Sequence, residues 1–226
     1  MKKALLINHH SPLDSGTVSH ILFNSHYFLT TINSHDIKFL DISDIKSYNL
    51  VCFFGGRASA NDNSFSIKAE FKLIEQLINY TIPIIGICLG AQLIAKFYGS
   101  KITNNESNKS EIGYNKVLNP NLKFFDKNNL SFMQFHNQGI SFNNSMDILG
   151  NGRLFDIDAF KIKNKSIFGF QFHPEVECAS ISRWYKSNNE PLSNSKNSLS
   201  KILKQHAQCK NSNYLWLKKT LLKVSS

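Results

Sequence analysis

The sequence predicts an α/β fold: a mainly parallel twisted sheet flanked by helices, with a helical C-terminal extension. In the first half, short apolar runs alternate with helix-patterned segments, which is the pattern of β-α-β units. Two of the runs, Leu50–Phe54 and Pro83–Ile87, are almost continuously apolar, as in strands covered on both faces of a parallel sheet. In the second half, short strand candidates separated by Asn-rich turns lead into helical segments.

The first half divides into alternating strands and helices. We expect strands where apolar residues run together, at Ala4–Asn8, Ile37–Ile42, Leu50–Phe54 and Pro83–Ile87. We expect helices where apolar residues recur at three- and four-residue spacing, at Gly16–Leu29, Ser66–Tyr80 and Ala91–Tyr98. The last helix follows the last of these strands almost at once, so a sharp turn must join the two.

The second half changes character. Its strand candidates are Glu111–Leu118, Lys123–Phe125, Phe132–Phe135, Ile157–Ile162 and Ser166–Phe172. Its helix candidates are Ala179–Lys186, Ser195–His206 and Tyr214–Val224. We therefore expect residues 1–177 to form one domain and residues 178–226 to form a basic helical extension packed on the same domain.

The positive charge is concentrated at the C-terminal end. The chain has 226 residues and a formal net charge of +10. Residues 178–226 hold 9 Lys and Arg against 1 acidic residue, so +8 of that charge lies there. Aromatic residues in this segment come in two pairs and are not interleaved with the basic residues as in single-strand binders. We expect a solvated lysine-rich face and no nucleic-acid partner.

Composition excludes several other classes. The cysteines at 52, 88, 178 and 209 include no C-x-x-C pair, and no P-loop motif is present, so we expect neither a metal nor another cofactor. The apolar run near Met1 is too short for a signal peptide, and no run is long enough to cross a membrane. The expected compartment is the cytoplasm, with reduced thiols.

The segment around Cys88 carries the strongest chemical signal. A strand runs into Gly86-Ile87-Cys88-Leu89-Gly90 and a helix runs out of it, as in a nucleophile elbow. Gly86 and Gly90 provide the small residues that such a tight turn needs. The N-terminus of the helix favours a thiolate, and the backbone N–H of Leu89 can face a developing oxyanion. Cys88 is therefore the candidate nucleophile.

Two further segments supply partners for this thiol. Gly55 and Gly56 end a neighbouring strand at the same sheet edge, where their backbone can offer a second oxyanion donor. His173-Pro174-Glu175 follows the last strand, and in extended backbone residues i and i+2 point the same way. A carboxylate on Glu175 can then orient the His173 imidazole that serves the thiol. By contrast, we interpret His9 and His10, after the first strand, as loop histidines.

Taken together, these motifs resemble those of class I (triad) glutamine amidotransferases. The matching residues are Gly86-x-Cys88-x-Gly90-x-Gln92 and Gln171-Phe172-His173-Pro174-Glu175. The segments Phe54-Gly55-Gly56 and Glu111-Ile112-Gly113-Tyr114 look like those of stand-alone relatives of the GMP synthetase glutaminase domain. The resemblance extends over roughly residues 1–180 and includes a helical C-terminal extension.

This resemblance implies a mechanism and a substrate. Cys88 would attack the side-chain amide of L-glutamine, His173 would transfer protons, and water would hydrolyse the glutamyl thioester. Gln92, His136 and the Gly55–Gly56 loop would hold the substrate. The ammonia would pass to a partner synthetase supplied in trans.

The sequence departs from the family at the mouth of the expected site. Arg57 stands where Pro often follows the Gly-Gly pair, and His136-Asn137-Gln138 stands where the family has His-Gly-Asp. Asp158 replaces a frequent Gln. These changes leave open a γ-glutamyl hydrolase or peptidase that acts on a larger γ-glutamyl metabolite with the same triad. A non-catalytic regulatory binding protein is a further alternative, and the intact triad argues against it.

Overall fold

The computed structural model describes residues 1–9, 15–187 and 198–225. The strands are β1 (Lys3–Asn8), β2 (Phe28–Asn33), β3 (Leu50–Phe53), β4 (Ile84–Ile87), β5 (Ile102–Asn104), β6 (Glu111–Lys116), β7 (Ser131–His136), β8 (Gln138–Ile140), β9 (Met146–Gly150), β10 (Ala159–Ile162) and β11 (Ile167–Phe170). The helices are α1 (Gly16–Asn24), η2 (Ser34–Phe39, a 3₁₀ helix), α2 (Ile42–Ile45), α3 (Phe65–Asn79), α4 (Leu89–Phe97), α5 (Leu122–Phe125), α6 (Cys178–Ser187) and α7 (Leu199–Val224).

A seven-stranded sheet forms the centre of the molecule, in the order β2-β1-β3-β4-β11-β10-β9. The strands from β2 to β11 pair in parallel, and β10 runs antiparallel to both of its neighbours. Two small antiparallel pairs, β5–β8 and β6–β7, lie beside this sheet. The predicted α/β fold with a mainly parallel sheet is confirmed.

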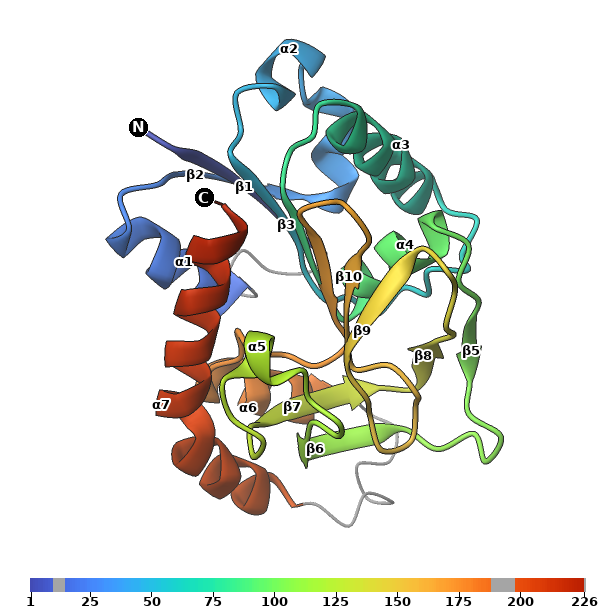
Figure 1. Ribbon diagram of the computed structural model, residues 1–226, viewed down its shortest axis with the longest axis vertical. Coiled ribbons are helices and arrows are strands. Elements are labelled where there is room, and N and C mark those ends of the chain that lie inside the picture. The colour runs from blue at the N-terminus through green and yellow to red at the C-terminus, as the bar shows by residue number, and fades with distance from the viewer. Residues whose placement is uncertain (10–14, 188–197, 226) are drawn as a thin grey trace.

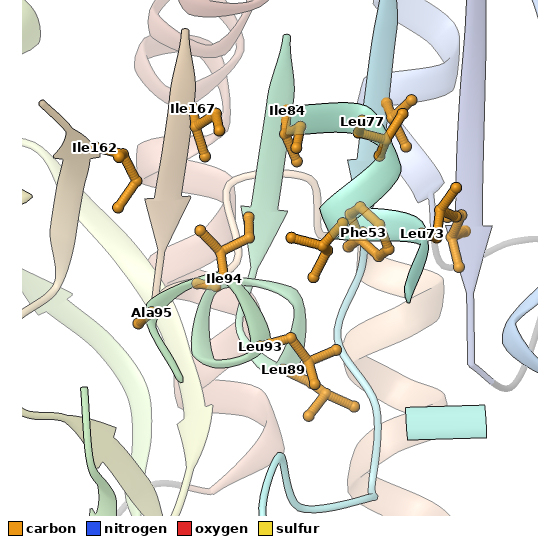
Figure 2. Close-up of a cluster of buried hydrophobic side chains, with 14 of the residues drawn as sticks. Phe53, Leu73, Leu77, Ile84, Leu89, Leu93, Ile94, Ala95, Ile162 and Ile167 are labelled. Atoms are coloured by element: carbon orange, nitrogen blue, oxygen red, sulfur yellow. The ribbon is translucent and has the colours of Figure 1, made fainter. Parts of the chain in front are cut away.

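Helices cover both faces of the sheet (Figure 1). Side chains of α3 and α4 pack with those of β3 and β4 on one face, as Figure 2 shows for Phe53, Ile84 and Leu93. On the other face, α1 and α7 pack against the alternate side chains of the same strands. In β1, for example, Leu5 joins the first cluster and Leu6 the second.

The prediction for residues 25–42 is wrong. The helix expected to reach Leu29 ends at Asn24, and the next strand is Phe28–Asn33. The expected strand Ile37–Ile42 lies instead in the 3₁₀ helix η2 and the start of α2, with the Asn33 side chain accepting a hydrogen bond from the backbone N–H of His35. Because β2 is an edge strand with no fully buried residue, it lacks the apolar run that marks the central strands.

Other corrections concern short or polar segments. Lys123–Phe125 belongs to the helix α5, begun by the Asn121 side chain, which accepts from the backbone N–H of Lys123. The two helices expected after residue 195 form one helix, α7, since the polar stretch between them contains no glycine or proline to stop it. Residues 195–197 lie outside the described part of the chain. Strands β5, β8 and β9 were not predicted.

Helix α7 lies along the sheet face (Figure 1) and inserts an indole into an aromatic cluster. The Trp216 ring stacks on Phe125 at a centroid distance of 5.3 Å, and it lies 4.8 Å from the Phe132 ring. Phe132 in turn stacks on Phe172, two residues beyond β11. In the described segments, no helix is long and apolar enough to cross a bilayer.

Candidate active site

The candidate site lies where three neighbouring parallel strands end. Gly55 follows β3, Cys88 follows β4 directly, and His173 follows β11. Since β4 lies between β3 and β11 in the sheet, Cys88 sits between the other two segments. Ligands of open α/β sheets bind at this carboxyl edge of the strands.

Cys88 has a strained backbone. Its φ of 51° and ψ of −106° lie in a region that residues with a Cβ rarely adopt. Its N–H donates to the carbonyl of Phe170 at 2.8 Å, which ties the turn to β11. Helix α4 begins at the next residue, Leu89, whose N–H is among those at a helix start that have no acceptor within the helix. The predicted sharp turn from strand to helix at Cys88 is therefore present.

Contacts explain the two glycines that flank this turn. A Cβ on Gly86 would lie 2.6 Å from the carbonyl group of Gly90 and from the backbone nitrogen of Ala91. A Cβ on Gly90 would overlap the carbonyl oxygen of Phe53. Any larger residue at either position would push α4 away from β3 and β4, and would move the cysteine between them.

The thiol of Cys88 has an amide neighbour. The Gln171 side chain donates through Nε2 to the Cys88 Sγ at 3.7 Å. The Gln171 Oε1 accepts from Gln92 Nε2 at 3.2 Å, and the same nitrogen donates to the carbonyl of Gln138 at 3.0 Å. Gln92 therefore reaches the thiol through Gln171. Gln171 belongs to a motif that the sequence displays, but no role was predicted for its side chain.

His173 and Glu175 form a buried pair. The His173 Nδ1 lies 2.8 Å from Glu175 Oε1, and both side chains are at most 4% exposed. Burial lowers the pKa of His173, but the charges of Glu175 and Cys88, and hydrogen bonds to both, raise it to about 10. The structure thus brings Cys88, His173 and Glu175 together, with His173 between the other two.

The Gly55–Gly56 loop lies directly against this group. A Cβ on Gly55 would lie 2.8 Å from His173 Cε1 and 3.5 Å from Cys88 Cβ. A Cβ on Gly56 would lie 2.9 Å from the Leu89 side chain. Only glycine lets this backbone come so close to Cys88 and the imidazole.

His136 lies in a polar cluster that meets the Gln92–Gln171 chain at the carbonyl of Gln138. Its Nδ1 lies 2.8 Å from the carbonyl of Gln138, and its Nε2 lies 3.0 Å from Gln134 Oε1. Gln134 in turn donates to Asp158 Oδ2 at 2.9 Å. Burial lowers the pKa of His136 to about 4, and the charge of His173 adds to this effect. In the described segments, its hydrogen bonds go to Gln138 and Gln134, and not directly to the thiol or to the His173–Glu175 pair.

Comparison with known proteins identifies the family. The family model for glutamine amidotransferase class-I matches residues 13–186. The chain belongs to this family.

Relatives of this amidotransferase include subunits of GMP synthase. It is 38% identical over 113 residues to one subunit of the glutamine-hydrolyzing GMP synthase of Methanobrevibacter smithii, covering 49% of this chain and 60% of that protein. It is 30% identical over 139 residues to the protein of the same name from Pyrococcus abyssi, covering 60% and 71%. The first match thus spans less than two thirds of the relative's length.

Solved structures share the fold along the whole chain. A glutamine amidotransferase from Thermotoga maritima has a TM-score of 0.88 and 24% identity, covering all of this chain and 98% of that one. One from Methylobacillus flagellatus has a TM-score of 0.84 and 20% identity, covering 99% and 95%. At these identities the likeness concerns the fold alone.

Trp184, beside the candidate site, carried no prediction from the sequence, and Arg57 was placed only at the mouth of the site. The Trp184 ring, from α6, lies 4.7 Å from the His173 ring. Arg57, which follows the Gly-Gly pair, donates to the carbonyl of Ser187 at the end of α6 at 3.1 Å. The segment after residue 177, predicted only to pack on the same domain, therefore contacts the candidate site at two points.

Among the described side chains, no group of three or more His, Cys, Asp or Glu is arranged to hold a metal ion. His9, interpreted as a loop histidine, is only 8% exposed and lies beside Gly56. His9 does lie in the bend after β1, as that interpretation states, but its side chain is buried against the Gly55–Gly56 loop. His10 lies outside the described residues.

Proposed function

We propose that this amidotransferase hydrolyses the side-chain amide of glutamine at Cys88 and supplies the ammonia to a separate synthetase chain. The observation that carries the proposal is the arrangement of a strained Cys88 beside His173, which Glu175 holds at 2.8 Å. The names of the two relatives, which describe a subunit of a glutamine-hydrolyzing synthase, support the same substrate and a partner chain.

In the first half of the reaction, the Cys88 thiolate attacks the side-chain carbonyl carbon of glutamine. The carbonyl oxygen becomes an oxyanion, which the N–H of Leu89 and the Gly55–Gly56 loop stabilise. His173 gives its proton to the amide nitrogen, the C–N bond breaks, and ammonia leaves. The product on the enzyme is a glutamyl thioester.

In the second half, His173 acts as a base. It takes a proton from water, and the resulting hydroxide attacks the thioester carbon. The C–S bond breaks, which releases glutamate and restores the thiolate beside a protonated imidazole. Throughout both halves Glu175 keeps the His173 ring in one orientation, and Trp184 covers one side of it.

The test is ammonia release from L-glutamine by the purified protein. Wild type should release ammonia, and Cys88→Ser should not, because a serine at this turn lacks a thiolate. Mass spectrometry after treatment with an electrophilic glutamine analogue should find one adduct, on Cys88. Labelling of Cys178 or Cys209 without Cys88 would contradict the assignment.

The same assay separates the two substrate classes. A γ-glutamyl peptide is offered in parallel with L-glutamine at equal concentration. If amine is released from the peptide faster than ammonia is released from L-glutamine, the protein is a γ-glutamyl hydrolase. That result would reject the supply of ammonia.

A further inference from the structure

A carboxylate lies in the apolar core below the candidate site. Glu70 occupies the buried face of α3 in register with Ile67, Ile74 and Leu77, and it is fully buried. In the described part of the chain, neither of its carboxylate oxygens has a hydrogen-bond partner. A buried carboxylate is costly unless a partner compensates it, so its presence among apolar residues needs a reason.

The partner of Glu70 is His9, one residue past the end of β1. The His9 Nε2 lies 2.9 Å from Glu70 Oε1, with the two side chains 5% and 0% exposed. The approach is close, but it is not aligned as a hydrogen bond. The two buried side chains are therefore in close polar contact.

His9 also packs against the Gly55–Gly56 loop. A Cβ on Gly56 would lie 2.8 Å from both Cβ and Cγ of His9, so the histidine side chain touches the loop backbone itself. The preceding residue, Gly55, packs in a similar way against the side chains of His173 and Cys88. A continuous set of contacts thus runs from Glu70 through His9 and the loop to Cys88.

We propose that Glu70 and His9 are a positioning pair that fixes the Gly55–Gly56 loop for oxyanion binding. The inference rests on the proposed function, because it concerns one step of that reaction. Donors to an oxyanion act only when they lie about 2.7–3.1 Å from its position. A loop of two glycines has no side chains of its own to hold it there. A displacement of about 1 Å can lower the rate on the order of 10²-fold.

The experiment compares two reactions of the same thiol. Glutamine hydrolysis passes through a tetrahedral oxyanion, whereas alkylation by iodoacetamide does not. In alkylation the sulfur displaces iodide from a saturated carbon, so a C–S bond forms as the C–I bond breaks. The alkylation rate at Cys88, followed by mass spectrometry, therefore reports the reactivity of the thiol without the oxyanion loop.

The variants are Glu70→Gln and His9→Gln, with Glu75→Gln as a matched control on the exposed side of α3. Each positioning variant should lower kcat for glutamine on the order of 10- to 100-fold, with KM and the alkylation rate within about twofold of wild type. Glu75→Gln should leave all three quantities unchanged. Either positioning variant suffices where the other does not give folded protein.

Two results would overturn the inference while wild type remains active. The first is a kcat unchanged in both variants. The second is an equal fall in hydrolysis and alkylation, which would mean that the pair supports the whole sheet edge and not the loop. A wild-type protein whose Cys88 is alkylated but which releases no ammonia would defeat the proposed function, and this inference with it.

Discussion

His173 is the residue on which the proposed chemistry depends most. Its pKa of about 10 in the folded chain lies above the ordinary value of 6.5, because the charges of Glu175 and Cys88 outweigh the effect of burial. The imidazole therefore holds a proton through the neutral range. Because the folded chain binds this proton more tightly than the unfolded chain, His173 adds to the free energy of unfolding. That contribution is complete below about pH 6.5 and is lost as the pH rises through about 10.

We expect His173→Ala to reduce ammonia release nearly as much as loss of Cys88, by roughly 10²–10⁴-fold. Glu175→Gln should be milder, because Glu175 orients the base and does not itself transfer the proton. Initial rates of the purified variants with L-glutamine test this order. Equal rates for wild type and His173→Ala are incompatible with the mechanism.

Asp158 should make stability depend on pH through a carboxyl group that stays protonated in the fold. Burial and the charge of Glu111 raise its pKa to about 8 from 3.8, although the hydrogen bond from Gln134 opposes this. Between these values the folded chain keeps a proton that the unfolded chain has lost. The free energy of unfolding should therefore fall as the pH rises to about 8, on the order of 1 kcal/mol per pH unit.

Asp158→Asn removes this titration and tests it. Urea unfolding at pH 5, 7 and 9, chosen around the pKa of about 8, should show the variant gaining on wild type as the pH rises. The exposed Asp156→Asn is the control and should follow wild type. A constant difference between Asp158→Asn and wild type across this range would contradict the raised pKa.

Sequence patterns locate site residues that are close in the chain and miss those brought together by folding. The spacing of His173 and Glu175 by two residues predicts their contact, which the structure shows at 2.8 Å. Trp184 was missed because it meets His173 through the packing of α6, which no local pattern encodes. Glu70 carried a signal that was overlooked: an acidic residue at an apolar position of a helix.

At the scale of elements, the packing of α4 against β3 depends on the absence of side chains. A Cβ on Gly90 would overlap the carbonyl of Phe53, whereas a Cβ on Gly99, just after α4, would meet open space, although Gly99 has a φ of +95°. Gly90 is therefore needed because a side chain would not fit, and Gly99 because its backbone conformation disfavours other residues.

We expect Gly90→Ala to destabilise the fold by about 1–3 kcal/mol and to lower Cys88 reactivity, because α4 must shift. Gly99→Ala should cost about 1–2 kcal/mol through its backbone conformation alone, with Cys88 reactivity intact. Urea unfolding and iodoacetamide labelling of Cys88 measure the two effects. Loss of reactivity in Gly99→Ala, or its retention in Gly90→Ala, would refute this division.

Elements could be predicted where burial imposes a pattern. β3 and β4 are buried along their whole length, and their apolar runs predict them closely. β2 could not be found, because an edge strand pairs by its backbone and its Thr30 and Thr31 are not fully buried. The continuity of α7 was missed since its polar middle includes Asn213, whose side chain donates to the carbonyl of Ser131.

For the whole molecule, we propose that residues 178–226 are an extension of the same domain and not a separate unit. Trp216 and Leu217 of α7 share a buried cluster with β4 and β11, and Trp184 of α6 reaches His173. The lysines of this segment that the structure describes, however, are exposed. Charges beyond about 8 Å are largely screened at physiological salt, so these lysines should not influence Cys88.

Replacing Lys201, Lys204 and Lys218 with Gln should keep ammonia release within a few-fold of wild type. Salt-sensitive association with an acidic partner should weaken. Lys219 is left in place because its Nζ lies 2.6 Å from Asp126 Oδ2, and Lys196 is left because it lies outside the described residues. A tenfold or larger loss of turnover in a folded variant would place the basic face in the catalytic apparatus.

The strained backbone of Cys88 has a consequence for how this chain evolves. Its φ of 51° and ψ of −106° are close to those that glycine adopts freely in a type II′ turn. A non-glycine residue there costs on the order of 1–3 kcal/mol, against a total stability of about 5–15 kcal/mol for a typical protein. A lineage that stopped using the thiol would gain stability by mutation to glycine at position 88. Selection on the thiol's chemistry is what opposes that drift.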